Sequence, residues 1–200
     1  MPSTNDSGLE IVELWTSRLL NQSLPGHERH TQRLAEIALA HDDEPVFSIE
    51  DASLEWLKAQ IGHGVNACLE RAGFTRPVGW SANARFDVER LEDYRCLKNH
   101  PGAYFTGFYV VRTSSGDEGI GVRDDRSPSS ITYYDPRAGV NMNAISRDPY
   151  IAYNHTYPLA PGQLLIWPAY VAYFLHPNLG NEPAIRIAFD IRVQAVDENQ

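Results

Sequence analysis

The last predicted strand of the chain carries polar side chains that could do chemistry. Residues 184–194 alternate between apolar and polar positions, and the polar face includes Arg186, Asp190 and Arg192. The apolar face consists of Ile185, Ile187, Phe189, Ile191 and Val193. Alternation with a period of two means that one face packs on apolar material while the other meets polar surroundings. The polar face meets either solvent or, if the strand belongs to a barrel, a ligand cavity.

Histidines elsewhere in the chain are weaker candidates. His27 and His30 are three residues apart on a predicted helix and so share a face. With Glu28 and Arg29 beside them, a solvated helix face is a simpler explanation than a metal site. His155 lies in a late predicted strand that could line a cavity. Several of the many aromatic side chains between residues 150 and 174 could form a flat apolar wall for an organic substrate.

The two cysteines do not indicate a metal site or a disulfide framework. Cys68 and Cys96 lack zinc-site spacing, and Cys68 falls on the apolar face of a predicted helix, where a free thiol packs as a small apolar group. Reduced thiols are typical of the cytoplasm. The N-terminus has no basic region followed by an apolar segment, so no signal peptide is expected. The sequence therefore predicts a cytoplasmic protein.

Composition excludes several classes of partner. The chain has 200 residues, of which 42% are hydrophobic and 10% aromatic, which is typical of a globular domain. The formal net charge of −9 argues against nucleic acid and anionic membrane surfaces as partners. No apolar run approaches the roughly 18–20 residues that span a bilayer.

The elements that must position the candidate residues divide the chain in two. A helix is predicted at 27–41, and a longer one at 50–72 that Gly73 and Pro77 terminate, whereas 9–20 is ambiguous between strand and helix. After residue 77, strands are predicted at 78–88, 104–112, 120–123, 130–134, 150–157, 163–175 and 184–194. Helices followed by strands indicate an α+β, mainly β fold, in which an antiparallel sandwich or barrel is backed by helices.

Several segments, taken together, carry a family resemblance. They are Asn99–Ala103 (NHPGA), Tyr104–Val111 (YFTGFYVV), Tyr134–Arg137 (YDPR), Gly162–Pro168 (GQLLIWP), His176–Asn178 (HPN) and Ile185–Asp190 (IRIAFD). In order and spacing they resemble a small bacterial and phage family of Fe(II)/2-oxoglutarate-dependent oxygenases. The resemblance implies a double-stranded β-helix (jelly-roll, cupin-like) core at 78–194. The rest of a single domain would be a flexible tail at 1–7 and a mostly helical front layer at 8–77.

The resemblance also implies a cofactor site. Enzymes of this family hold Fe(II) with two histidines and usually one carboxylate, and leave open positions for 2-oxoglutarate and oxygen. An arginine on the last strand pairs with the distal carboxylate of 2-oxoglutarate, because a guanidinium binds a carboxylate in bidentate fashion. Arg186 matches that position. The alternative is that Arg186 pairs with Asp190 or another surface acid, which would contribute little.

The expected iron ligands are substituted in this chain. Lys98 stands where the family has the first histidine of its His-x-His-Pro motif, and Tyr173 stands where it has the late histidine; His100 is retained. An ammonium and a phenol are poor ligands for Fe(II). Lys98 is suited to pair with a substrate carboxylate, to act as a base, or to form a Schiff base. Tyr173 can donate a hydrogen bond or act as a general acid.

A rebuilt metal site is a second interpretation. His176 lies three residues after Tyr173 and ten before Arg186, and Asp135 could add a carboxylate to His100 and His176. Residues 173 and 176 of a regular strand point to opposite faces, so a bulge or turn would be needed to bring His176 inward. Otherwise His176 lies on a surface turn and Asp135 caps a turn.

Three functions follow from these interpretations. The leading one is an Fe(II)/2-oxoglutarate-dependent oxygenase acting on a small molecule or peptide. The second is a metal-independent isomerase, cyclase or lyase of a biosynthetic intermediate that uses Lys98, His100 and Tyr173. The third is a catalytically inactive binding protein on the same scaffold. The sequence identifies neither substrate nor pathway, and it leaves a homodimer open.

Overall fold

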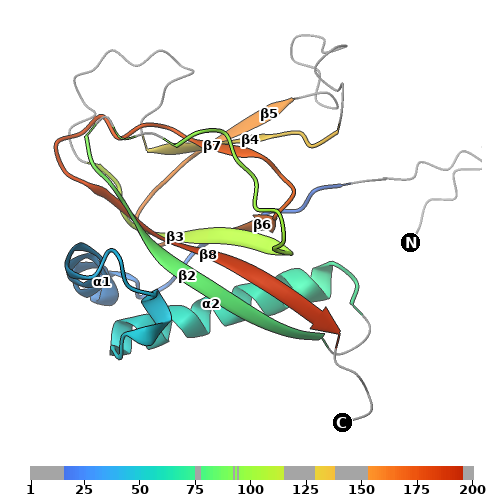
Figure 1. Cartoon of the computed structure of the whole chain (residues 1–200), viewed down its shortest axis with the longest axis horizontal. Coiled ribbons are helices and arrows are strands. Elements are labelled where there is room, and N and C mark those ends of the chain that lie inside the picture. Colours follow the sequence, from blue (N-terminus) through green and yellow to red (C-terminus); the bar gives the residue numbers. More distant parts are fainter. Residues whose placement is uncertain are drawn as a thin grey trace, which may run out of the picture.

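The computed structural model describes residues 16–74, 78–91, 93, 95–114, 129–137 and 153–195. Two helices, a larger sheet and a smaller sheet form successive layers (Figure 1). The helices are α1 (Glu28–Ala40) and α2 (Ala52–Arg71), with a short 3₁₀ helix at Val46–Ser48 between them. The strands are β1 (Leu20–Ser23), β2 (Val78–Glu89), β3 (Phe105–Arg112), β4 (Ser130–Tyr134), β5 (Asn154–Pro158), β6 (Gln163–Pro168), β7 (Tyr173–Leu175) and β8 (Ala184–Ala195).

The two sheets make the jelly-roll that the resemblance implied. The larger sheet has the order β1-β6-β3-β8-β2 and the smaller one the order β5-β4-β7, and every pairing is antiparallel. Strands that follow one another in the chain repeatedly pair with distant ones, so the chain winds between the sheets rather than along one of them. An isolated bridge between Lys98 and Tyr173 adds the segment before β3 to the edge of the smaller sheet.

Two apolar clusters hold the layers together. The first lies between the helices and the larger sheet and includes Leu57 of α2 and Ile187 of β8. The second lies between the two sheets and includes Phe108, Trp167 and Ala188. Since Ile187 and Ala188 are consecutive, the larger sheet is buried on both faces. The alternation in residues 184–194 thus marks a helix-facing side and a side that faces the smaller sheet.

The helix predictions are confirmed. Asp51 caps α2 by accepting a hydrogen bond from the Ser53 backbone at 2.8 Å, and its carboxylate also binds Arg33 of α1 at 2.8 Å. The helix ends at Arg71, and Gly73 follows with a φ of 85°, which only glycine adopts without strain. None of the described helices is long and apolar enough to cross a membrane.

Most strand predictions are also confirmed, with three differences. The single strand predicted at 163–175 is two strands, because the chain turns after Pro168, where Val171 N–H donates to the Pro168 carbonyl. The short β1 was not predicted; it lies in the stretch expected to be mostly helical. The strand predicted at 150–157 begins at Asn154, and residues 150–152 and the strand predicted at 120–123 lie outside the described residues.

Glycines at two positions of α2 allow a direct test of this packing. A Cβ added to Gly64 would lie 2.9 Å from Ile166 Cδ1, whereas one added to Gly62 would meet only Trp80 at 3.6 Å. We expect Gly62→Ala to stabilise the protein by about 0.5–1 kcal/mol, since alanine is the better helix former. Gly64→Ala should be less stable than Gly62→Ala by about 1 kcal/mol or more because it overpacks the helix against β6. Urea unfolding of the two variants measures the difference, and equal stabilities would contradict this packing.

Candidate active site

Polar residues of β8 and β2 line one side of the space between the sheets. The antiparallel register of the two strands sets Asp87 opposite Arg186 and Asn83 opposite Asp190. Residues directly opposite each other share a face, so these side chains point the same way as Ala188, which packs between the sheets. The polar face predicted for the last strand therefore lies inside the jelly-roll near its edge, where it meets the segment containing Lys98 and His100.

His100 joins two strands that are far apart in the sequence. Its Nδ1 lies 2.7 Å from Asp190 Oδ1 on β8, and its Nε2 lies 3.0 Å from the Tyr173 hydroxyl on β7. Because an ionised carboxylate can only accept, Nδ1 carries a proton and donates to Asp190. In the neutral ring Nε2 then accepts from the Tyr173 hydroxyl. A carboxylate, an imidazole and a phenol thus form one directed chain of hydrogen bonds.

The pKa values of the two end groups support this direction. Burial opposes the ionisation of Asp190, but hydrogen bonds from His100 and from Thr106, at 2.8 Å, outweigh it and lower its pKa. Burial raises the pKa of Tyr173 above its usual value, so the phenol stays protonated and donates. His100 is therefore held between a charged acceptor and a neutral donor.

The backbone of Lys98 fixes this residue beside the Asp190–His100–Tyr173 hydrogen bonds. Lys98 N–H donates to the Tyr173 carbonyl at 3.1 Å, and Tyr173 N–H donates back at 2.9 Å. The ammonium lies 5.6 Å from the centre of the Tyr173 ring, within the range of a cation–π contact. Burial, followed by the positive charge of Arg85, lowers the pKa of Lys98. Among the described residues, no salt bridge forms at Lys98.

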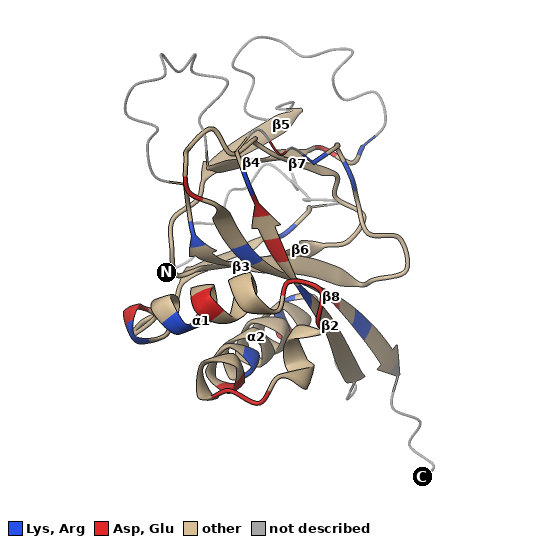
Figure 2. Ribbon diagram, turned by 60° about the vertical axis from the view of Figure 1, so that its left-hand side comes forward, with Lys and Arg blue, Asp and Glu red and all other residues tan. Residues whose placement is uncertain are grey.

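Arg186 is bound by carboxylates of the protein itself. Its Nη2 lies 3.0 Å from Asp87 Oδ2 and 2.8 Å from Glu89 Oε2, both on β2, and its Nε donates to Asp87 at 3.1 Å. Arg186 is 3% exposed and Glu89 is 0% exposed, so water does not reach this cluster freely. Figure 2 shows acidic positions at the end of β2 nearest the smaller sheet. Arg186 therefore has acid partners within the protein, but they are buried and neither is Asp190, whereas the alternative sequence interpretation expected Asp190 or another surface acid.

The two acids that bind Arg186 are not equivalent. Burial opposes the ionisation of Asp87, but Arg186 and Arg95 outweigh it and lower its pKa. Arg95 binds the other carboxylate oxygen of Asp87, Oδ1, at 2.8 Å. In contrast, burial dominates at Glu89 and raises its pKa, and its Oε1 has no hydrogen-bond partner among the described residues. Asp87 is therefore the firmly ionised partner of Arg186.

The other two residues of the expected iron triad lie elsewhere. His176 Nε2 is 2.8 Å from the Thr132 hydroxyl, on the face of the smaller sheet opposite Tyr173, as the strand alternation predicted. Asp135 accepts hydrogen bonds from the backbone and side chain of Arg137, which supports the predicted turn. No group of three or more histidine, cysteine, aspartate or glutamate side chains within the described residues could hold a metal ion. The structure therefore does not assemble His100, Asp135 and His176 into a metal site.

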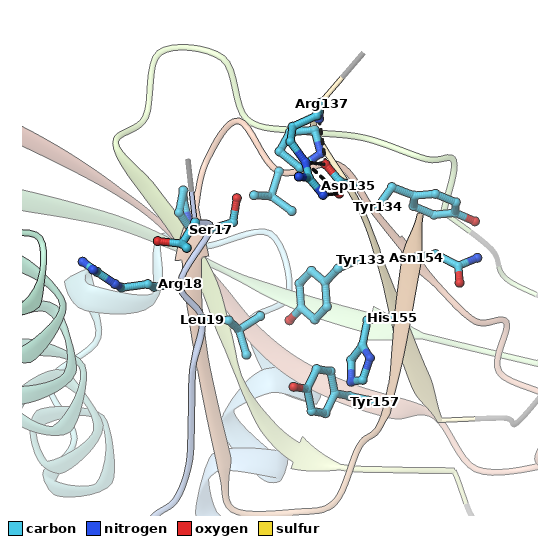
Figure 3. A pocket seen from close by; sticks show the side chains of 14 residues that line it. Ser17, Arg18, Leu19, Tyr133, Tyr134, Asp135, Arg137, Asn154, His155 and Tyr157 are labelled. Carbon is cyan, nitrogen blue, oxygen red and sulfur yellow. Dashed lines mark hydrogen bonds and ion pairs between the residues drawn. The ribbon is translucent and has the colours of Figure 1, made fainter. Parts of the chain in front are cut away.

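Two pockets open beside these residues. One, of about 420 Å³, lies over the ends of β2 and β8 and is lined by His100, Asp190, Asn83 and Arg192. The other, of about 380 Å³, lies at the smaller sheet, where His155, Tyr133 and Tyr157 face one another (Figure 3). His155 thus lines a pocket, as its position in a late strand suggested. Only the first pocket exposes the carboxylate–imidazole pair, and we take it as the candidate active site.

The fold matches those of solved enzyme structures at low sequence identity. No family model and no curated protein sequence matches the chain. Among solved structures, a Pseudomonas putida prolyl-4-hydroxylase matches with a TM-score of 0.61 and 12% identity over 92% of this chain and 89% of that one. SnoN, a non-heme α-ketoglutarate-dependent epimerase from nogalamycin biosynthesis, matches with a TM-score of 0.57 and 12% identity over 91% and 80%. A structure of SnoN with Fe³⁺, α-ketoglutarate and nogalamycin RO matches with a TM-score of 0.53 and 13% identity over 92% and 83%.

The side chains of this protein do not fit the cofactors that this fold holds in SnoN. Both ring nitrogens of His100 are occupied by hydrogen bonds to Asp190 and Tyr173. The neighbouring Lys98 offers an amine, which is a poorer ligand for Fe(II) than the histidine it replaces. Arg186, the residue expected to take the distal carboxylate of 2-oxoglutarate, is already bound by two internal carboxylates. The donor set suits proton transfer better than metal binding.

Sequence reasoning missed three residues of this site. Asp190 was placed on the polar face of the last strand, but the only role considered for it was as a partner for Arg186. Asp87 and Glu89 also alternate, at the end of the strand predicted at 78–88. Their register with β8 could not be deduced, since the strands that pair are separated by about a hundred residues.

The Arg186 cluster predicts an asymmetric response to loss of its two arginines. Arg186→Met leaves the buried Glu89 without a compensating charge and Asp87 with only the exposed Arg95, and should lower the free energy of unfolding by about 3–5 kcal/mol. Arg95→Met removes only the 45% exposed partner of Asp87 and should cost at most about 1 kcal/mol. Urea unfolding at neutral pH measures both values. Similar losses in the two variants would mean that Arg186 is not the main compensating charge.

The lowered pKa of Asp190 predicts a pH-dependent contribution to stability. Asp190 ionises more readily in the folded protein than at its ordinary pKa of 3.8, so its contribution is present above about pH 4. It is lost as the pH falls through the lower folded value. Asp190→Asn should therefore cost about 1–2 kcal/mol at pH 5 and less at pH 3. Unfolding followed across this range tests the trend, with exposed Asp43→Asn as control; a constant difference would contradict it.

Proposed function

We propose that this protein is a metal-independent enzyme that transfers protons on a small oxo acid. The observation that carries the proposal is the Asp190–His100–Tyr173 hydrogen-bond chain with Lys98 beside it. His100 is the general base, Asp190 holds its tautomer and stabilises the imidazolium, and Tyr173 relays the proton. The oxygenase fold supplies the position of these residues, and the chemistry is that of the side chains.

The relay lets His100 act through a phenol that is never left ionised. When a substrate proton passes to the Tyr173 oxygen, the phenolic proton passes to His100 Nε2 in the same step. The substrate loses one proton, His100 gains one, and Tyr173 ends as a neutral phenol. This suits the raised pKa of Tyr173, since a free tyrosinate at a buried position would be costly. Asp190 then faces the imidazolium at 2.7 Å.

The charges near the relay favour an anionic substrate. Lys98 and Tyr173 both feel the charges of Arg85, Arg186 and Asp87. With Arg95 included, the arginines in this region outnumber Asp87 and Asp190, the two acids whose pKa values are lowered. A substrate carboxylate would balance the excess positive charge. A proton next to a carbonyl group is acidic enough for an imidazole base to remove, and for these reasons we choose oxo acids as the substrate class.

Two alternatives rest on the same scaffold. The fold supports an Fe(II)/2-oxoglutarate-dependent oxygenase. The hydrogen bonds at both ring nitrogens of His100 and the two carboxylates that bind Arg186 make this function less favourable. A binding protein without turnover is favoured by the low exposure of Tyr173, which is 4%. The 11% exposure of the His100 side chain in an open pocket favours catalysis instead.

Proton exchange measures the proposed activity directly. Pyruvate, 2-oxobutyrate and 2-oxoglutarate are incubated with the protein in D₂O containing EDTA, and NMR follows loss of the C3 proton signals. We expect exchange above the buffer rate, and a loss of about 100-fold in His100→Gln. His63→Gln, at an exposed position of α2, is the matched control and should exchange as the wild type does.

The outcomes separate the three functions. Exchange that EDTA abolishes would contradict a metal-independent reaction. Absence of exchange with every oxo acid would contradict the substrate class and favour a binding protein. A visible charge-transfer band from Fe(II) and 2-oxoglutarate without oxygen, lost in His100→Ala, would support the oxygenase instead.

A further inference from the structure

We propose that Lys98 forms an imine with the carbonyl carbon of its substrate, and that the substrate also carries a carboxylate that Arg85 binds. The inference rests on the proposed function and extends it, because it names a covalent step and the residue that performs it. General acid–base chemistry by His100 needs no such step. The surroundings of Lys98 favour the covalent step.

The backbone around Lys98 is held in place by hydrogen bonds at residues 98 and 100. Its backbone makes two hydrogen bonds to Tyr173, and two residues later His100 N–H donates to the Ala169 carbonyl at 3.0 Å. These bonds fix residues 98–100 against β7 and the turn before it. The amine therefore emerges from a rigid segment, next to the ring whose hydroxyl binds His100. A nucleophile and a proton relay are thus set side by side.

The amine lacks the partner that most lysines have in such a place. Lys98 is half-buried, yet no salt bridge forms at it among the described residues. Lys58, the other lysine of the chain, is 51% exposed and lies 3.7 Å from Glu55. Burial and the positive charges of Arg85, Arg95 and Arg186 favour a neutral amine at Lys98. The neutral amine is the form that attacks a carbonyl.

The covalent step balances with the groups present. The Lys98 nitrogen attacks the carbonyl carbon and the carbon–oxygen π bond breaks. One nitrogen proton passes through Tyr173 to His100, which returns it to the oxygen to give a carbinolamine. The second nitrogen proton, moved along the same path, converts the hydroxyl to water, which leaves as the carbon–nitrogen double bond forms. The two protons lost by the nitrogen are those gained by the oxygen, and water is the only by-product. Hydrolysis reverses each step, and no oxidant or reductant is required.

Arg85 is the arginine best placed to bind the substrate carboxylate. Its Nη1 lies 3.6 Å from Asp190 Oδ2, a long ion pair, and its side chain is 47% exposed. Arg186 is 4% exposed at its side chain and is occupied by two carboxylates. Arg85 therefore has guanidinium donors that a ligand can reach, whereas Arg186 does not.

Trapping with a reducing agent tests the imine on a chain that has only Lys58 and Lys98 as lysines. The folded protein is incubated with glyoxylate, the smallest aldehyde with a carboxylate, and cyanoborohydride near neutral pH. Peptide mass spectrometry then measures carboxymethylation at both lysines. We expect Lys98 to react several-fold faster than Lys58, and unfolding in urea to abolish the difference. Equal or slower labelling of Lys98 in the folded protein would overturn the proposal.

Acetaldehyde and an Arg85 variant test the carboxylate. Acetaldehyde has the same carbonyl without the charge, so its preference for Lys98 should be several-fold smaller. Arg85→Gln should lower the glyoxylate preference and leave the acetaldehyde preference unchanged. An unchanged glyoxylate preference in Arg85→Gln would show that Arg85 does not bind the carboxylate.

Lys98→Arg distinguishes this inference from the proposed function. If Lys98 is trapped and oxo-acid exchange is lost in Lys98→Arg, the imine lies on the path of exchange. If Lys98 is not trapped while exchange requires His100, the imine is wrong and the acid–base function stands. If Lys98 is trapped but no exchange occurs, the covalent site stands and the proton-transfer function fails.

Discussion

The placement of Arg186 between Asp87 and Glu89 is the constraint on which the rest of the site depends. A guanidinium that is 3% exposed must be neutralised, and here two carboxylates of β2 neutralise it within the sheet. The ion pairs of Arg186 with Asp87 and Glu89 hold the end of β2 against β8, the strand that also carries Asp190. It also removes Arg186 from the anion-binding role that the resemblance implied. Any ligand of this jelly-roll must therefore be recognised by the remaining groups.

The substitutions in the site support one another. As ligands for a metal ion, Lys98 would offer an amine in place of an imidazole, and Tyr173 would offer a phenol that burial keeps protonated. Lys98 and Tyr173 are better suited to a site that transfers protons than to one that binds a metal ion. The Tyr173 hydroxyl satisfies His100 Nε2, and the Lys98 ammonium lies over the Tyr173 ring. Lys98 and His100 both contact Tyr173, so the residues that replace the expected ligands belong to one connected network.

Sequence patterns predicted the layers of this fold well because each depends on neighbours close in the chain. The apolar stripe of 50–72 and the alternation of 184–194 are local, and both gave the correct element and its buried face. The short β1 was missed since its partner β6 lies more than a hundred residues away. The resemblance identified Lys98, His100, Tyr173 and Arg186 by position. It could not supply their partners, which depend on the register between β2 and β8.

The fold likeness and the site chemistry point to different conclusions because they are set by different residues. At 12% identity the likeness to solved structures extends to the fold, which depends on the apolar positions that build two facing sheets. The polar residues between the sheets are free to change as long as their charges stay balanced. Here Asp87 and Glu89 compensate Arg186, while Lys98 and His100 both contact Tyr173. The compensation of Arg186 within the chain thus leaves His100 and Lys98 as the groups on which the proposed reaction depends.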